Sequence, residues 1–300
     1  MPTAGKASWR ELLRQGEHLL RRRARPDPCE DAGTDAFLLM QAAGGPDRSH
    51  YPLQKNDPCP PALREKYLAL LRRRAAGEPV QYILGEWEFM GLDFKVGPGV
   101  LIPRPETEQL AEQAIESLRG RPKCRVLELC GGSGCIAVSV AKALPAADIT
   151  VLELSPDAMR YLRENIARHG VKNVTAIQGD ALCPPPEITG PYDAILSNPP
   201  YIASGELAHL QKEVQKEPVM ALDGGGDGLK FYRGFNTIYP KMLAPGGLLL
   251  YETGEEQGEA VAALLQKAGL REVRILRDVY GQPRNVLGYA PEKPSKTVKK

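Results

Sequence analysis

Apolar and polar residues follow a helical period in the first quarter of the chain. Apolar side chains recur at three- and four-residue spacing in residues 8–25, in residues 29–43 and from Pro60-Pro61 to Gly77. Ser8 precedes the first of these segments and is a predicted N-cap. No strand-like segment occurs before residue 79. Residues 1–78 are therefore predicted to form a small helical bundle.

The pattern changes at residue 79. Tyr82–Gly85 and Glu86–Phe89 predict two extended pieces, and Leu92–Val96 alternates with period two. Gly91 lies between the last two at a predicted turn. We therefore expect residues 79–104 to form a linker that contains a β-hairpin. The chain then enters a helix, with Pro105 in the first turn.

Strands and helices alternate beyond residue 120, which is typical of a parallel sheet covered by helices on both faces. The predicted strands are residues 125–129, 148–153, 173–178, 192–197, 247–253, 272–277 and 285–290. The predicted helices are residues 134–144, 156–169, 228–243 and 255–268. We expect residues 105–290 to form a doubly wound α/β domain with seven strands.

Charge is distributed unevenly over the 300 residues, whose net charge is +2. Residues 1–78 carry 14 basic and 10 acidic side chains, whereas residues 79–290 are net acidic. The net charge of +2 argues against indiscriminate binding of nucleic acid, which needs a strong basic excess, and we expect no direct sequence-specific binding of nucleic acid either. Residues 291–300 are rich in lysine and proline, and we expect this tail to be disordered.

The cysteines and the hydrophobic runs suggest a compartment. The six cysteines include no C-x-x-C pair, so we predict no metal site, and reduced thiols of a cytoplasmic protein are the simpler interpretation. No run approaches the roughly 20 apolar residues of a membrane span, so we expect no membrane partner.

A glycine-rich loop lies where the first strand of the α/β domain gives way to a helix. Its sequence is Glu128-Leu129-Cys130-Gly131-Gly132-Ser133-Gly134. Glycines allow a backbone to approach a ligand closely, and the helix N-terminus adds N–H donors. Such a loop alone is a weak signal, because dinucleotide enzymes use related loops.

Two acidic residues strengthen the prediction of an adenosine-type ligand. Glu153 ends the second strand and could accept hydrogen bonds from both hydroxyls of a ribose. Asp180 ends the third strand and could accept from the exocyclic amine of an adenine. Taken alone, each acid could equally be a helix cap or a solvated strand end. Together with the loop they mark three successive strand ends, where parallel sheets bind ligands.

The fourth strand ends in Asn198-Pro199-Pro200-Tyr201. An amide or aryl amine nitrogen is a poor nucleophile, because its lone pair is delocalised into a π system. The side-chain oxygen of Asn198 and the carbonyl of Pro199 could each accept one N–H of such a group. They would aim its lone pair at an electrophile such as a sulfonium methyl group. Proline has a restricted φ and no competing N–H, and Tyr201 could pack on the planar group.

With these motifs the chain resembles the PrmC/HemK family of release factor glutamine methyltransferases. The resemblance runs from about residue 77 to 290 and, more loosely, over the helical segment. The most specific segments are Gly77–Gly85, Ile102–Glu108 and Asn198–Ile202. Glu217-Pro218, Ala221-Leu222, Gly224–Gly228 and Glu252 also fit.

The resemblance implies a Rossmann-like class I methyltransferase sheet of seven strands that follows a helical, substrate-binding domain. It implies that S-adenosyl-L-methionine donates the methyl group and that the glutamine of the Gly-Gly-Gln loop of peptide chain release factors accepts it. It places the cofactor among Glu128, Cys130–Gly134, Glu153, Asp180, Ala181 and Asn198. It places the acceptor glutamine at Asn198–Tyr201.

The resemblance also implies that the segment containing Arg104 and Glu106 covers the site and contacts the substrate. Its simple alternative is a helix start with acids in the first turn. The chain departs from the family pattern in three ways. Cys130 replaces the first glycine of the loop, whose leading Asp is Glu128; Glu153 replaces an Asp; and Ala181 replaces a frequent aromatic residue. Because of these changes, the sequence does not predict the affinity for the cofactor.

Other interpretations remain open. The same motif serves enzymes that methylate N6 of adenine in DNA or RNA, although the acidic domain disfavours a nucleic-acid substrate. A glutamine in a ribosomal protein is a closer alternative. A non-catalytic binding module or a nicotinamide oxidoreductase would leave the motif without a role. Arg72–Arg74 could contact an acidic partner, but a solvated helix face is favoured. We expect a monomer; the preferred release factor is not predicted.

Overall fold

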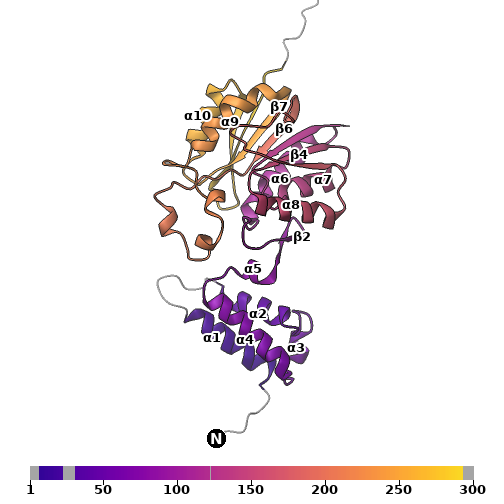
Figure 1. Ribbon diagram of the computed structural model, residues 1–300, viewed down its shortest axis with the longest axis vertical. Coiled ribbons are helices and arrows are strands. Elements are labelled where there is room, and N and C mark those ends of the chain that lie inside the picture. Colours follow the sequence, from indigo (N-terminus) through magenta and orange to yellow (C-terminus); the bar gives the residue numbers. More distant parts are fainter. Residues whose placement is uncertain (1–6, 23–30, 122, 293–300) are drawn as a thin grey trace, which may run out of the picture. The chain divides into compact units, whose positions relative to one another are not determined.

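The computed structural model describes residues 7–22, 31–121 and 123–292. It divides into two compact units, which are described separately (Figure 1). The first unit comprises residues 1–86 and 210–216, and the second comprises residues 87–209 and 217–300. The ends of the predicted helices at residues 23–25 and 29–30, and nearly all of the predicted tail, lie outside the described residues.

The first unit is helical, as the apolar spacing predicts. Its helices are α1 (Trp9–Arg21), α2 (Ala32–Ala42), α3 (Tyr51–Gln54), α4 (Pro61–Ala75) and α5 (Val80–Leu84). The N-cap at Ser8 is confirmed. Its hydroxyl accepts from the N–H of Glu11 at 3.3 Å, and the carboxylate of Glu11 accepts from the N–H of Ser8 at 2.8 Å. These two bonds form a capping box that starts α1.

The predicted extended piece at Tyr82–Gly85 is wrong, because these residues form α5 and its C-cap. Pro79 introduces the helix and Gly85 ends it in the left-handed conformation, with φ of 79°. Val80, Tyr82 and Ile83 are buried, and α5 packs against α2 and α4. A five-residue segment is too short to reveal its period, so packing against α2 and α4 determines its structure.

The predicted hairpin is confirmed. Strands β1 (Glu86–Phe89) and β2 (Leu92–Lys95) pair as a two-stranded sheet. Met90 and Gly91 form the turn with φ of 52° and 72°, the left-handed values that a tight two-residue hairpin requires. The N–H of Met90 donates to Glu108 at 2.6 Å, which ties the turn to helix α6 (Pro105–Leu118).

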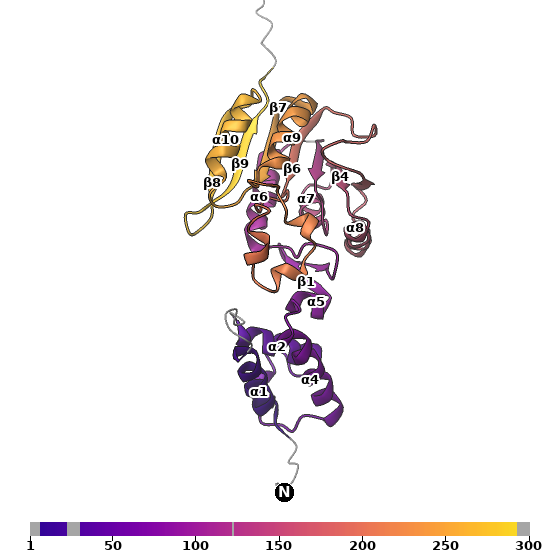
Figure 2. The ribbon, with the colours of Figure 1, turned by 60° about the vertical axis from the view of Figure 1, so that its left-hand side comes forward.

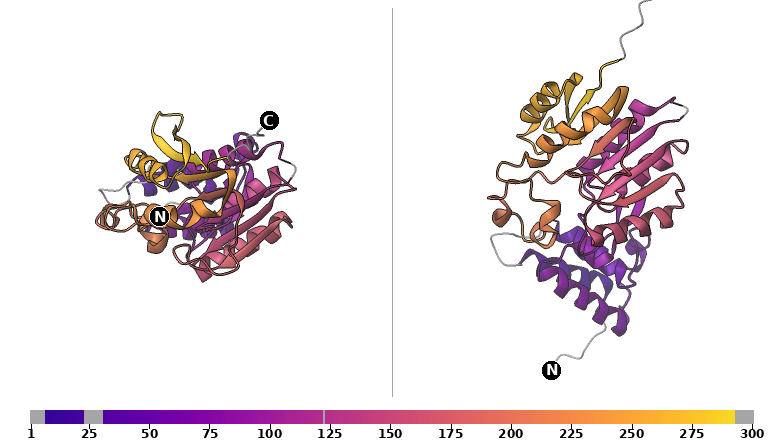
Figure 3. Two further views of the ribbon diagram at one scale, coloured as in Figure 1. Left: turned by 90° about the horizontal axis from the view of Figure 1, so that it is seen from above. Right: turned by 45° about the horizontal axis from the view of Figure 1, so that its top comes forward.

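The second unit is built on a seven-stranded sheet, which confirms the predicted α/β class (Figures 2 and 3). The strands are β3 (Arg125–Leu129), β4 (Asp148–Glu153), β5 (Val174–Gln178), β6 (Tyr192–Ser197), β7 (Leu243–Glu252), β8 (Arg271–Arg277) and β9 (Pro283–Tyr289). Their order is β5-β4-β3-β6-β7-β9-β8. The first five strands are parallel, and β9 is antiparallel to both of its neighbours.

Alternating side chains of the strands build two hydrophobic cores. Val126 faces the core shared with α6, α7 (Cys135–Ala143) and α8 (Pro156–His169). Leu127 faces the opposite core, shared with α9 (Lys230–Ile238) and α10 (Gly258–Lys267). Strands buried on both faces require this near-continuous apolar sequence. Among the described residues, no helix is long and apolar enough to cross a membrane.

The topology gathers the carboxyl ends of the parallel strands at one edge of the sheet. β3 lies between β4 and β6, and the connections run from it to β4 on one side and, after β5, to β6 on the other. Such a reversal opens a crevice beyond the ends of the two central strands. The glycine-rich loop follows β3 and Asn198 follows β6, so both lie at this crevice.

A buried ion pair stabilises the first unit. Arg74 is only 3% exposed, and its guanidinium lies 2.5 Å from a carboxylate oxygen of Asp35 and 2.7 Å from one of Glu213. Arg72 and Arg73 are exposed, as expected of a solvated face, but that expectation is wrong for Arg74. The apolar spacing of α4 could not reveal a buried cation, because its partners come from distant segments.

Replacing Arg74 by Ala is expected to destabilise the first unit by about 3–5 kcal/mol, because Asp35 stays buried without this cation. The measurement is urea unfolding in a Trp87→Phe background, where the fluorescence of buried Trp9 reports on this unit. Arg72→Ala, an exposed change on the same helix, is the matched control. Equal unfolding midpoints for the two variants would contradict a stabilising role of the ion pair.

Candidate active site

The glycine-rich loop is shaped by close packing. Cys130, Gly132 and Gly134 adopt left-handed φ values of 60°, 54° and 79°. A Cβ atom at Gly131 would lie 2.1 Å from a methyl of Val151, and one at Gly134 would lie 2.3 Å from a methyl of Leu162. These glycines therefore let the loop lie directly on β4 and α8. Cys130 holds a conformation that favours glycine, at the position where the family pattern has one.

Asn165 of α8 anchors this loop from behind. It is fully buried, and its amide nitrogen donates to the carbonyl of Ser133 at 2.9 Å and to that of Lys95 at 3.1 Å. Its oxygen accepts from the N–H of Lys95 at 2.7 Å. The Asn165 side chain thus connects the glycine-rich loop, α8 and the end of the hairpin. Nothing in the motif itself pointed to Asn165.

Glu153 stands at the end of β4 beside the loop. One carboxylate oxygen accepts from the N–H of Gly132 at 2.8 Å, and the other accepts from the N–H of Ser155 at 2.7 Å. Burial raises the pKa of Glu153, and the bonds from Ser155 and Gly132 oppose that rise. Each oxygen keeps a further lone pair, so the carboxylate can still accept a pair of vicinal hydroxyls.

The loop and the strand ends line a pocket, the place where such a fold binds small molecules. Predicted residues that line it are Cys130, Gly132, Glu153, Asp180, Ala181, Asn198 and Pro200. Residues that were not predicted also line it, and they include Leu101, Leu154, Met220 and Phe231. Polar groups at a mainly apolar wall suit a flat heterocycle with a sugar attached.

Ala181 and Phe231 both line this pocket. Ala181 is small, where the family pattern often has an aromatic residue, and its carbonyl accepts from the hydroxyl of Tyr239 at 2.7 Å. Phe231 of α9 supplies an aromatic ring to the same pocket. Its location on a distant helix explains why inspection of the strand ends missed it. Asp180 uses one oxygen to accept from the N–H of Leu182 at 2.8 Å.

Glu128 lines a smaller pocket that shares Cys130, Gly132 and Asn198 with the larger one. It is 1% exposed, and one of its oxygens has no hydrogen-bond partner among the described residues. Burial raises the pKa of Glu128 to about 8, opposed by a bond from the N–H of Ala137. An unpartnered buried carboxyl fits a ligand that carries a cation, such as the ammonium group of an amino acid.

The Asn198–Tyr201 motif begins at the pocket wall and leads away from it. Asn198 and Pro200 line the larger pocket. The backbone of Tyr201 is held from two sides, because a Cβ at Gly224 or at Gly228 would lie within 2.7 Å and 2.3 Å of it. The side chain of Gln257 also donates to the carbonyl of Tyr201 at 2.8 Å. Gly224 and Gly228 therefore allow their segment to pack directly against the backbone of Tyr201.

The segment that begins at Arg104 is tied to the loop after the motif. Glu217 is 4% exposed; its carboxylate accepts from the N–H of Ile102 at 2.9 Å and forms an ion pair with Arg104. Arg104 and Thr107 line the smaller pocket. Glu106 is exposed and lines neither pocket, so its contact with a substrate stays a prediction.

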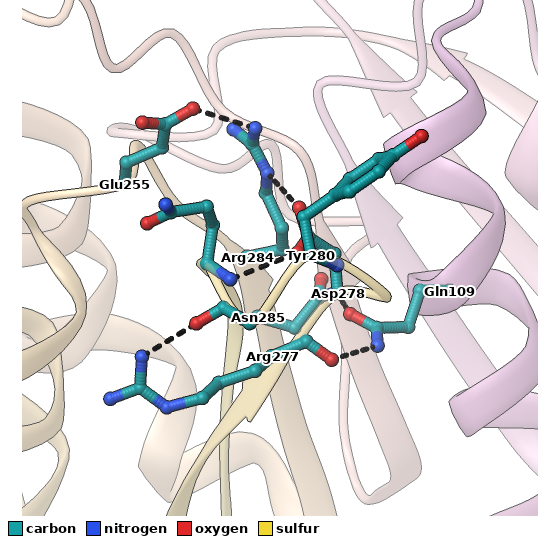
Figure 4. A network of polar contacts seen from close by, with 9 residues as sticks. Gln109, Glu255, Arg277, Asp278, Tyr280, Arg284 and Asn285 are labelled. Atoms are coloured by element: carbon teal, nitrogen blue, oxygen red, sulfur yellow. Dashed lines mark hydrogen bonds and ion pairs between the residues drawn. The ribbon is translucent and has the colours of Figure 1, made fainter.

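A polar network braces the tip of the β8–β9 hairpin at the same edge of the sheet (Figure 4). Arg284 lies 2.7 Å from Glu255 and 3.1 Å from Asp278. Gln109 of α6 donates to the carbonyl of Arg277 at 2.8 Å and accepts from Asn285 at 2.7 Å. The network holds the Arg284 cation near the motif, where it acts electrostatically on Tyr201 and Glu252.

Comparison with known proteins identifies the family. Residues 11–85 match the PrmC N-terminal domain, and residues 107–229 match the methyltransferase small domain. The release factor glutamine methyltransferase of Geobacter sulfurreducens is 42% identical over 260 residues, 86% of this chain and 90% of that protein. The chain belongs to this family.

Two further comparisons agree. The release factor glutamine methyltransferase of Bordetella pertussis is 43% identical over 256 residues, which are 85% of this chain and 94% of that protein. The solved structure of a methyltransferase from Pyrococcus furiosus is 17% identical, covers 73% of this chain and 97% of its own, and has a TM-score of 0.50. That likeness shows a shared fold. The cofactor of the protein described here, as a member of the family, is S-adenosyl-L-methionine.

The pockets fit that cofactor. Glu153 can accept the ribose hydroxyls, Asp180 and Phe231 can hold the adenine, and Glu128 can accept the ammonium of the methionine part. Asn198 lines both pockets, so it would lie beside the bound cofactor. These roles remain predictions, which the following two experiments test.

Glu128 is expected to make cofactor binding pH-dependent. Its carboxyl is protonated at pH 7 without ligand, and a bound ammonium lowers its pKa, so binding releases a proton. Affinity should rise up to about tenfold per pH unit between pH 6 and pH 8. Calorimetry in buffers of different ionisation enthalpy measures both effects. Glu128→Gln should bind with a shallower pH dependence and release less proton; an unchanged slope would exclude this role.

Glu153→Ala is expected to weaken cofactor binding roughly 10- to 100-fold, because bonds to a charged acceptor contribute about 1.5–3 kcal/mol each. Asp148→Ala is the control, since it removes an exposed carboxylate from the opposite end of the same strand. Equilibrium binding of S-adenosylhomocysteine measures both variants. If the two bind alike, the ribose does not lie at Glu153.

Proposed function

We propose that this protein transfers a methyl group from S-adenosyl-L-methionine to the side-chain amide nitrogen of the glutamine in the Gly-Gly-Gln loop of peptide chain release factors. The observation that carries the proposal is the place of Asn198 at the junction of the two pockets. The relatives bearing the name release factor glutamine methyltransferase cover nearly the whole chain and support it.

The residues of the motif supply orientation. The Asn198 oxygen and the Pro199 carbonyl accept the two N–H bonds of the glutamine amide, which aims the nitrogen lone pair into the cofactor pocket. Holding the reacting atoms in line makes the reaction effectively unimolecular, because the loss of translational and rotational entropy occurs on binding. This can raise the rate by several orders of magnitude. The same two oxygens stabilise the positive charge that develops on the nitrogen. Bound S-adenosyl-L-methionine supplies the electrophilic methyl group.

The residues of the motif are shielded from water. Pro199 and Pro200 are buried, and burial raises the pKa of the Tyr201 hydroxyl, which therefore stays neutral at physiological pH. A neutral ring next to the motif suits a planar, uncharged amide. The nearby carboxyls at Glu128 and Glu252 are also shielded from water.

We further propose that the helical first unit helps to bind the release factor and that the protein acts as a monomer. Its surface offers the exposed Arg72 and Arg73, the latter in an ion pair with Glu78. We place the reaction in the cytoplasm, where release factors act. The five cysteines in the described part of the chain are free thiols, which suits a reducing compartment.

The test is incubation with radiolabelled S-adenosyl-L-methionine and purified release factor, beside the same factor carrying Gln→Ala in its Gly-Gly-Gln loop. Label should enter only the intact factor. Label in neither factor, with cofactor binding confirmed, would overturn the proposed acceptor. Ribosomal protein and adenine-containing RNA or DNA would then be assayed in the same way.

Asn198→Ala is expected to reduce kcat by at least about 100-fold, because one of the two orienting oxygens is lost. Thermal unfolding should be nearly unchanged, since Asn198 is only half-buried. Asn236→Ala on α9 is a control for removal of a partly buried amide elsewhere in the same unit. Turnover near that of the wild type would rule out orientation by Asn198.

A further inference from the structure

The two prolines of the motif donate no backbone hydrogen bonds, because neither Pro199 nor Pro200 has an N–H group. The proposed function assigns the Pro199 carbonyl to the acceptor amide. The position of this carbonyl therefore depends on what holds the chain before and after the prolines. The anchor before them is β6, whose last residue, Ser197, pairs with β3 and β7.

The anchor after the prolines comes from the loop that follows β7. The side-chain amide nitrogen of Gln257 donates to the carbonyl of Tyr201 at 2.8 Å. The next residue, Ile202, donates to the carbonyl of Leu222 at 2.9 Å and accepts from the N–H of Gly224 at 2.8 Å. Gln257 thus holds the last residue of the motif, between the prolines and these backbone bonds.

A second contact fixes the direction of the Gln257 amide. Its oxygen accepts from the N–H of Gly254 at 3.1 Å. A backbone N–H can only donate and a backbone carbonyl can only accept, so the Gln257 oxygen must face Gly254 and its nitrogen must face Tyr201. Turning the amide over would place donor against donor and acceptor against acceptor. The direction therefore does not depend on the ionisation of any side chain.

Gly228 leaves the space for this contact. A Cβ atom at this position would lie 2.3 Å from the amide nitrogen of Gln257 and 2.3 Å from the carbonyl oxygen of Tyr201. Any other side chain would therefore displace at least one of the two atoms. The glycine-rich stretch after the motif and the loop after β7 thus meet at the Tyr201 carbonyl.

We propose that Gln257 is a positioning residue, which fixes the carboxyl end of the motif so that the Pro199 carbonyl points at the acceptor nitrogen. The proposal rests on the proposed function, because that function assigns the acceptor amide to the Pro199 carbonyl. Gln257 lines neither of the two pockets. Its effect on the reaction therefore passes through the backbone of Tyr201.

Gln257→Met keeps the length of the side chain and removes both polar atoms. The kcat should fall about 10- to 100-fold, because a small misplacement of an orienting group is costly in rate. The affinity for S-adenosylhomocysteine should stay close to that of the wild type, since Gln257 lies outside the cofactor pocket. Glu256→Met, at the adjacent exposed position, is the matched control. Wild-type kcat in Gln257→Met, or equal losses in the two variants, would overturn the proposal.

Gln257→Glu tests the donor itself. The introduced carboxylate can still accept from Gly254, but its other oxygen faces the Tyr201 carbonyl without a proton to donate. Protonation restores that donor. At saturating cofactor and release factor, kcat relative to the wild type should therefore rise as the pH falls from about 8 toward about 5.5. The same ratio for Gln257→Met, which cannot regain a donor, should stay constant. A constant ratio for Gln257→Glu, or an equal rise for Gln257→Met, would overturn the proposal.

A measurement without turnover separates this proposal from the proposed function. In the full chain, isotope labels at the tyrosine carbonyl carbons and the isoleucine amide nitrogens give a nuclear magnetic resonance correlation only for Tyr-Ile pairs. The sequence contains two such pairs, Tyr82-Ile83 and Tyr201-Ile202. The Tyr201-Ile202 signal should shift in Gln257→Met, whereas the Tyr82-Ile83 signal, from the first unit, should not. This result would support the contact even where release factor proves not to be the acceptor, and an unchanged Tyr201-Ile202 signal would refute it.

Discussion

The site depends on one topological constraint: parallel strands bring their carboxyl ends to a single edge of the sheet. β3, β4, β5 and β6 deliver the glycine-rich loop, Glu153, Asp180 and Asn198 to that edge. The reversal of connections beside β3 leaves a crevice there, and none of the four strands could contribute its residues elsewhere without changing the fold. The candidate site residues therefore lie at the strand ends that the topology brings together.

Buried carboxyl groups are the second common feature of this edge. Glu128, Glu153 and Glu252 are all at least nine-tenths buried, and burial raises the pKa of each. Such groups lower the stability of the folded protein unless a cation or a hydrogen bond compensates. Glu153 is compensated by two backbone N–H groups, whereas Glu128 and Glu252 each keep an oxygen without a hydrogen-bond partner in the part of the chain that the structure describes. A ligand that supplied such a partner would stabilise the folded protein.

Periodicity and local motifs predicted much of this molecule. The seven strands, the hairpin and the Ser8 cap follow from alternation, glycine at a turn and a capping residue, which are local signals. The extended piece predicted at Tyr82–Gly85 was wrong because the five residues of α5 are too few to show a period. Residues that act across the fold carried no signal of this kind. Phe231 reaches the pocket from a distant helix, and Arg74 is buried by partners far away in the chain.

Thr107 shows the same limit within the site. It lies in a segment that resembles the family, yet only the folded chain shows that it contacts Asn198 at 3.2 Å across 91 positions of the sequence. A motif reveals which groups can react. The neighbours that orient those groups depend on how α6 packs against the end of β6 and β7, which the sequence pattern does not specify.

The central claim is that a glutamine amide is held by the Asn198 oxygen and the Pro199 carbonyl. The most direct test is a crystal structure with S-adenosylhomocysteine and a Gly-Gly-Gln peptide. We expect the glutamine nitrogen to lie about 2.7–3.2 Å from both oxygens. A peptide bound with its amide carbonyl toward Asn198, or bound away from the motif, would contradict it.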